Sequence, residues 1–69
     1  MKSMYVNNVG NNTYKGILMC KSSESSSLTT SEVTLDSGEI INLVDGSVVI
    51  EVDTNARHIL YDGKWYKKQ

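Results

Sequence analysis

The stretch SEVTLDSGEIINLVDGSVVIEVD, residues 31–53, predicts three antiparallel strands joined by two tight turns. The second turn contains Asp45-Gly46, the pair that a type I′ hairpin prefers, because both of its central residues take a positive φ. Such a turn places Ile41 opposite Ile50 and directs both side chains to one side of the sheet. The sequence therefore predicts a hairpin centred on Asp45-Gly46.

The length of the first turn in this stretch follows from the alternation of side chains between the two faces of a strand, because a slip of one residue would move a whole apolar set to the other face. A three-residue loop with Gly38 in the left-handed conformation pairs Leu35 with Glu39 and Val33 with Ile41. The three strands then share one continuous apolar face. Its members are Val33, Leu35, Ile41, Leu43, Val48, Ile50 and Val52.

The opposite face of these strands is only partly polar. Ile40, Val44 and Val49 lie on it, and no other segment of the chain offers them a cover. Charge is usually depleted at the centre of a subunit contact, and three aliphatic side chains are about what a two-fold contact needs there. We therefore predict a homo-oligomer with its interface at Ile40, Val44 and Val49, which Val49→Asp would dissociate without unfolding the chain.

The length of 69 residues predicts a single small β domain, 1–69. A chain of this length is near the lower limit at which one hydrophobic core suffices without staples, which adds to the case for oligomerisation. The single cysteine, Cys20, can form no intrachain disulfide. It follows three apolar residues and is expected to be a buried side chain rather than a reactive thiol.

The N-terminal part of the chain predicts a further hairpin. Residues 4–6 and 13–21 read as strands, because the Gly and Asn residues at 10–12 turn easily. Gly16 interrupts the second strand, and a glycine there often marks a bulge or a corner at which a small sheet bends. Residues 22–27, SSESSS, predict a mobile loop because they can bury no apolar surface.

The last hairpin contains Asp62-Gly63, a second pair suited to a type I′ turn, and it places Leu60 opposite Trp65. No window of ten or more residues shows the apolar spacing of a helix. The expected fold is therefore all-β, an antiparallel meander of six or seven short strands curled into a small barrel or sandwich, with no substantial helix.

Charge is distributed unevenly, since residues 22–54 contain seven acids and no Lys or Arg, whereas four of the seven cations follow residue 55. Aromatic residues alternate with these cations, so the terminal hairpin is a candidate site for a protein partner or a small anionic ligand. Four cations and a net charge of −1 argue against nucleic acid, although base stacking in a small single-strand-binding barrel stays an alternative. The candidate residues are Arg57, His58, Tyr61, Lys64, Trp65, Tyr66 and Lys67.

No constellation of residues suits catalysis. The one histidine, His58, follows Arg57 in an expected strand, and no nucleophile elbow is present. Neither Asp53 nor Asp62 stands at a recurrent metal-ligand spacing from His58, and phosphate-binding and calcium-binding motifs are missing. We therefore predict a non-enzyme with no catalytic residue, no metal and no cofactor.

The last quarter of the chain resembles small proteins encoded by tailed bacteriophages. EVDT at residues 51–54, ILYDG at 59–63 and then Trp65-Tyr66 are similar to the carboxy-terminal hairpin of minor virion and fibre-associated phage proteins. The resemblance implies a phage-type accessory or decoration protein that acts through its surfaces, and it transfers no catalytic residue. The alternative is a phage-encoded inhibitor of a host defence system, which caps a host protein or sequesters a nucleotide signal.

The place of action follows from the same features. No apolar run reaches the length of a membrane span, and the N-terminus lacks the basic-then-apolar pattern of a secretion signal. The chain is therefore expected to have no membrane partner and to act in the host cytoplasm or on the virion.

Overall fold

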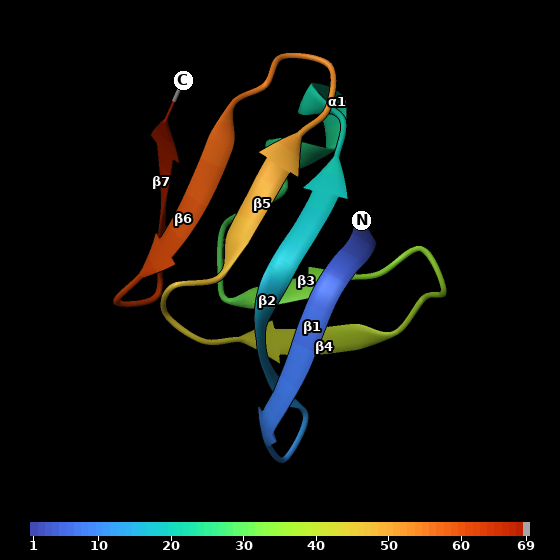
Figure 1. Ribbon diagram of the computed structural model, residues 1–69, viewed down its shortest axis with the longest axis vertical. Helices are drawn as coiled ribbons and strands as arrows, with labels where there is room; N and C mark the ends of the chain where they lie inside the picture. The colour runs from blue at the N-terminus through green and yellow to red at the C-terminus, as the bar shows by residue number, and fades with distance from the viewer. Residues whose placement is uncertain (69) are drawn as a thin grey trace.

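The computed structural model describes residues 1–68, and it confirms the all-β class (Figure 1). No helix in this part of the chain has the length and apolar character needed to cross a membrane. In chain order the elements are β1 (Lys2–Gly10), β2 (Thr13–Cys20), α1 (Ser22–Ser25), β3 (Glu32–Thr34), β4 (Ile40–Leu43), β5 (Val48–Glu51), β6 (Arg57–Tyr61) and β7 (Lys64–Lys68).

All seven strands belong to one curled sheet, and β2 is the strand that joins its parts. β1 pairs antiparallel along one edge of β2, while β4 and β5 both pair parallel with the other edge. β3 extends the sheet beyond β4, and β6 and β7 extend it beyond β5. The sheet is therefore mixed rather than an antiparallel meander, and it forms a half-barrel (Figure 1).

The hairpin predicted at Asp45-Gly46 is wrong. Only Gly46 has a positive φ, 92°, whereas a type I′ turn needs positive φ at both central residues. The N–H of Ser47 donates to the carbonyl of Val44 at 3.2 Å, which closes a tight turn. This turn carries the chain from β4 to β5 along the same edge of β2, so β4 and β5 are successive neighbours of β2 and are not paired with each other.

The loop between β3 and β4 has the three-residue form that was predicted. Val33 lies opposite Ile41, the N–H of Leu35 donates to the carbonyl of Glu39 at 2.8 Å, and Gly38 has φ 92°. Both Val33 and Ile41 are buried, as the three-residue loop requires. Local turn chemistry therefore fixed the register of this hairpin.

The terminal hairpin is confirmed as well. Asp62 and Gly63 have φ values of 53° and 76°, as a type I′ turn requires, and Leu60 lies opposite Trp65. The indole N–H of Trp65 donates to the carbonyl of Thr30 at 2.7 Å, which holds the ring over the core. Trp65 is therefore half-buried and serves the packing of the fold.

The segment SSESSS contains one helical turn, α1, where a mobile loop was predicted. The Oε1 of Glu24 accepts from the N–H of Lys21 at 3.5 Å and so caps the turn. The carboxylate of Asp53 accepts from both the N–H and the hydroxyl of Ser22, at 2.9 and 2.7 Å. Contacts with a distant part of the chain therefore order a segment that composition alone marks as loop.

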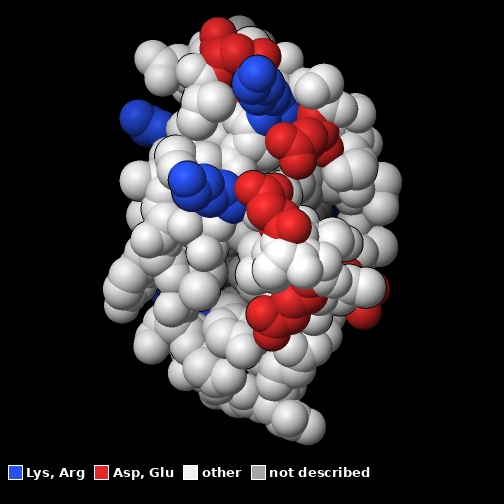
Figure 2. All heavy atoms as spheres, turned by 90° about the vertical axis from the view of Figure 1, so that its right-hand side faces the viewer, with Lys and Arg blue, Asp and Glu red and all other residues white. Residues whose placement is uncertain are grey.

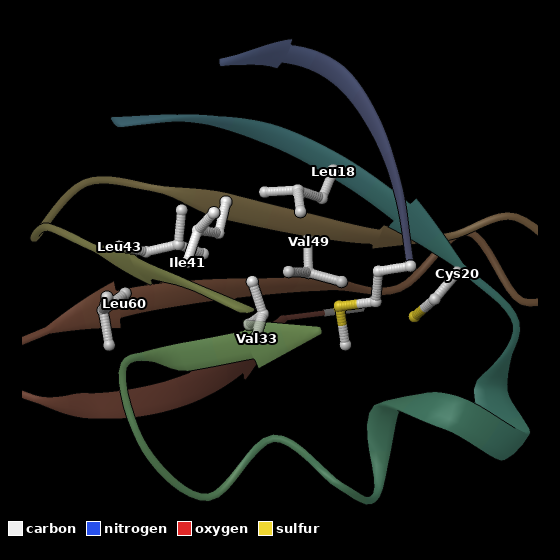
Figure 3. Packing of buried hydrophobic residues seen from close by; sticks show 8 residues of the cluster. Leu18, Cys20, Val33, Ile41, Leu43, Val49 and Leu60 are labelled. Atoms are coloured by element: carbon white, nitrogen blue, oxygen red, sulfur yellow. The ribbon is translucent and has the colours of Figure 1, made fainter. Parts of the chain in front are cut away.

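The core lies on the inner face of the half-barrel, where side chains from all parts of the sheet meet (Figure 3). β5 contributes Val49, which is 0 % exposed, and not the predicted Val48 and Ile50, which point to the outer face. The predicted Val52 follows the end of β5 and is 55 % exposed. The buried apolar residues are Met1, Leu18, Cys20, Val33, Ile41, Leu43, Val49, Ala56 and Leu60.

β5 presents to the core the side opposite to the one predicted, and this also corrects the expected oligomer interface. Ile40 is 54 % exposed and Val44 is half-buried, whereas Val49 lies inside the core of a single chain. The three side chains therefore do not form one patch, because Val49 points to the opposite face. Association of copies stays a prediction, and it has no interface at Val49.

Gly16 lies opposite Val6 and is packed tightly against the backbone of β1, whereas the nearest irregularity in this pair of strands lies between Ser3 and Tyr5. A Cβ there would fall on the carbonyl oxygen of Tyr5 and 2.7 Å from the Cα of Val6, and backbone atoms cannot rotate away. We expect Gly16→Ala to lower the free energy of unfolding by about 1–3 kcal/mol, as measured by urea titration. Gly10→Ala is the control, because its nearest neighbour, the Cβ of Thr13, lies at 3.6 Å. Equal stability of the two variants would contradict the close approach at Gly16.

Candidate functional site

The structure divides the predicted binding residues between the two faces of the terminal hairpin. His58 lies opposite Lys67 on the inner face, beside the pair formed by Leu60 and Trp65. The outer face carries the remaining predicted residues, which are Arg57, Tyr61, Lys64 and Tyr66. The seven residues therefore belong to two separate environments.

The inner group centres on Glu51, whose carboxylate is completely buried. It accepts hydrogen bonds from the hydroxyls of Ser25, at 2.7 Å, and Thr54, at 2.5 Å, and lies 2.5 Å from the Nε2 of His58. The ammonium of Lys67 lies 3.7 Å away. In residues 1–68 every buried side-chain nitrogen and oxygen has a hydrogen-bond partner, so no buried polar atom of this cluster is left unpaired.

The hydrogen bonds of the inner group join separate elements of the fold. Hydrogen bonds from Thr54, His58 and Ser25 lower the pKa of Glu51 to about 2, so the carboxylate is ionised at neutral pH. In a catalytic triad the histidine lies between the acid and the nucleophile, whereas here the carboxylate lies between Ser25 and His58. The cluster joins α1, β5 and β6, and the sequence analysis assigned no such role to Glu51.

No metal site accompanies this cluster in the described part of the chain. Within residues 1–68, no three His, Cys, Asp or Glu side chains are grouped to hold a metal ion. The one cysteine, Cys20, is buried, and burial raises the pKa of its thiol. It lies in the core with the aliphatic side chains (Figure 3).

The outer face carries a row of apolar side chains that crosses five strands. Tyr5 lies opposite Ile17, Ile17 beside Val48, Val48 opposite Ile59, and Ile59 opposite Tyr66. We call these five residues the outer row. With neighbouring strands about 4.8 Å apart, the outer row is about 19 Å long.

The outer row is open to solvent. Figure 1 shows β1, β2, β5, β6 and β7 side by side, with β3 and α1 behind β1, β2 and β5. Tyr5 is 64 % exposed and Tyr66 is 50 % exposed, so both ends of the row present an aromatic ring. A small protein seldom leaves a contiguous patch of this kind without a use for it.

Basic side chains flank the outer row on both sides. Lys15 and Lys64 lie on one side, and Arg57 and Lys68, which are opposite each other, lie on the other. Within residues 1–68, none of the outward-pointing positions of β1, β2, β5, β6 and β7 is Asp or Glu, and Glu32, which points outward from β3, is separated from the outer row by β4. Two acids border it in turns, where the side chain of Asp45 accepts from the N–H of Asp62 at 2.9 Å. The face is therefore suited to an anionic partner.

Acidic side chains gather instead beside the N-terminal residue. The α-ammonium of Met1 lies 3.3 Å from the carboxylate of Glu24 and 3.0 Å from that of Asp36. These residues and Glu32 line a hollow of about 440 Å³. Figure 2 shows acidic side chains running down the side on the right of Figure 1, with basic ones among them in its upper half. Acidic side chains thus outnumber basic ones on this side of the molecule.

Sequence reasoning found the part of this face that lies in the terminal hairpin and missed the rest. Tyr5 and Lys15 escaped it because they lie far from the hairpin along the chain. A signal was present, since Lys15 and Ile17 occupy the same side of an expected strand. The hairpin predicted at Asp45-Gly46 hid this signal, because it turned Val48 towards the core.

The aromatic rings, aliphatic side chains and cations of this face are thus brought together only when the sheet is assembled. Since no family model, no curated protein and no solved structure matches this chain, its function is inferred from the side chains of this face.

Proposed function

We propose that this protein is a non-enzymatic accessory protein that acts by stoichiometric binding, and that its outer face binds single-stranded nucleic acid. The observation that supports this most is the outer row, with a tyrosine at each end, cations on both sides and no carboxylate among its strand positions. Aromatic rings stack on bases of any sequence, and Lys and Arg pair with phosphates. The face offers both kinds of group over one continuous surface.

The size of the face suits a short single strand. The row is about 19 Å long and has room for only a few nucleotides. This is the lower end of the roughly 4–16 nucleotides that small β-barrels occupy. Tyr61 is 65 % exposed on the same side of the row as Lys64, and adds a third ring near the Tyr66 end. A single strand can therefore meet stacking surfaces at both ends of the row.

The charge of the face predicts modest, salt-dependent binding. With four flanking cations in contact with phosphates, the logarithm of the association constant should fall against the logarithm of salt concentration with a slope of about −3. The acids beside Met1 lie outside this face, so we expect the cations of the outer face to determine the slope. Binding is therefore best measured at low ionic strength.

Fluorescence anisotropy with a labelled oligothymidylate of about twelve nucleotides tests this proposal. We expect the protein to bind it, and we expect Tyr66→Ala to weaken binding by about tenfold, since each stacked base is worth roughly 1–3 kcal/mol. Lys15→Ala should weaken binding and reduce the salt slope by about 1 unit.

Two exposed residues away from the outer row supply matched controls. Ile40→Ala removes an exposed apolar side chain of β4, and Lys21→Ala removes a cation beyond the end of β2. Both variants should bind the oligonucleotide as the parent does. No binding by the parent protein at low salt, or equal losses in the controls, would overturn the proposal.

The biological setting we propose is that implied by the resemblance of the terminal hairpin to tailed-phage proteins, an accessory role in the host cytoplasm or on the virion. A role as an inhibitor of host defence that caps a protein would use the same face for an acidic protein surface. That role would leave the oligonucleotide unbound, so the anisotropy measurement separates the two.

A further inference from the structure

A hollow of about 350 Å³ opens in the outer face at the Tyr5 end of the outer row. Its volume falls within the range of about 300–1,000 Å³ that is usual for small-molecule sites. The residues around it come from β1, β2 and the turn that leads into β5. They include Tyr5, Asn7, Lys15, Gly16, Gly46 and Val48.

Two glycines border this space. Gly16 lies where β2 changes its neighbour from β4 to β5, and its N–H donates to the hydroxyl of Ser47 at 3.3 Å. Gly46 has φ 92°, and a Cβ there would lie 3.1 Å from the Cε of Lys15. The hollow therefore follows from the way the chain turns along β2, and the side chain of Lys15 lies against its edge.

Three polar or aromatic groups converge on the hollow. The exposed ring of Tyr5 offers a stacking surface, and the amide of Asn7 offers both donors and an acceptor. The ammonium of Lys15 supplies a positive charge, and none of the residues that line the hollow is Asp or Glu. A nucleotide presents the complementary set, which is a planar base, a polar base edge and a phosphate.

We infer that this hollow binds one nucleotide, with its base on the ring of Tyr5, its base edge at the amide of Asn7 and its phosphate at Lys15. The inference rests on the proposed function and deepens it, because a nucleotide within a strand and a free nucleotide offer the same chemistry. An asparagine amide pairs best with the N6 and N7 atoms of adenine, so adenine is the base the hollow prefers.

The test uses the whole protein and two probes, adenosine 5′-monophosphate and uridine 5′-monophosphate, followed by the NMR shifts of the Tyr5 and Asn7 amides. We expect the adenine nucleotide to bind about fivefold or more tightly than the uracil nucleotide. Tyr5→Ala should weaken binding of the adenine nucleotide by about tenfold. Asn7→Leu should abolish the preference between the bases, and Lys21→Ala should change neither.

The oligothymidylate measurement separates this inference from the proposed function. If the oligonucleotide binds while neither mononucleotide moves the Tyr5 and Asn7 signals, the hollow is not a nucleotide site and the outer face still binds a strand. If the adenine nucleotide binds and the oligonucleotide does not, the hollow serves a free nucleotide and the proposed function is wrong. If Asn7→Leu keeps the preference for adenine, the assignment of the base edge is overturned.

Discussion

Val49→Asp is expected to leave the chain unfolded at room temperature, whereas Val48→Asp, one residue earlier, is expected to fold. Val49 is 0 % exposed and lies in the core cluster with Leu18 and Leu60 (Figure 3). An unpaired carboxylate there costs about 4 kcal/mol or more, which is comparable with the roughly 3–5 kcal/mol that a single core supplies at this length. Val48 points outward and is half-buried, so a carboxylate at residue 48 keeps its contact with water.

Far-UV circular dichroism and thermal unfolding of the two variants measure this difference. The pair is well matched, because the same substitution is made in neighbouring residues of the same type on the same strand. A folded Val49→Asp protein together with an unfolded Val48→Asp protein would mean that β5 faces the other way, as a hairpin at Asp45-Gly46 would require.

Glu51→Gln is expected to lower the melting temperature at neutral pH and to remove part of the acid sensitivity of the fold. The pKa of Glu51 is lowered from 4.5 to about 2 by hydrogen bonds from Thr54, His58 and Ser25. A carboxyl group whose pKa is lowered in the folded state stabilises it above the unfolded pKa. That contribution is fully present above about pH 4.5 and is lost as the pH falls towards about 2.

Melting temperatures measured between neutral pH and about pH 2 test this prediction. The parent protein should lose more of its melting temperature over the acid range than Glu51→Gln does. Glu32→Gln is the control, because Glu32 is exposed on β3 and should leave the acid profile of the parent unchanged. Parallel acid profiles of the parent and Glu51→Gln would show that the cluster adds no pH-dependent stability.

Turn residues in the sequence predicted the pairing of neighbours along the chain and failed where the partner was distant. Gly38 and Asp62-Gly63 join strands that pair with each other, so local geometry was enough. Asp45-Gly46 has the same composition, but each flanking strand finds its neighbour in β2. The contacts that hold β4 and β5 against β2, such as the hydrogen bond from Gly16 to Ser47, leave no pattern in residues 31–53.

The candidate site was predictable to the extent that it lies in one hairpin. Arg57, Tyr61, Lys64 and Tyr66 alternate along two adjacent strands, so their common face follows from period two. Tyr5 and Lys15 join them only after β5 is placed between β2 and β6. The burial of Glu51 was equally out of reach, because its partners come from α1, a turn and β6, which no local pattern relates to β5.

The shared edge of β2 also bears on how the chain folds. The β1–β2, β3–β4 and β6–β7 hairpins join residues that are close in sequence, whereas the parallel pairing joins Ile17 with Val48. The entropy of closing that long loop must be met before the parallel contacts stabilise the chain, so hairpins precede it. We infer that docking of β4 and β5 against β2 is the late, rate-limiting event, and that the hollow at Gly16 and Gly46 comes into existence only in that last step.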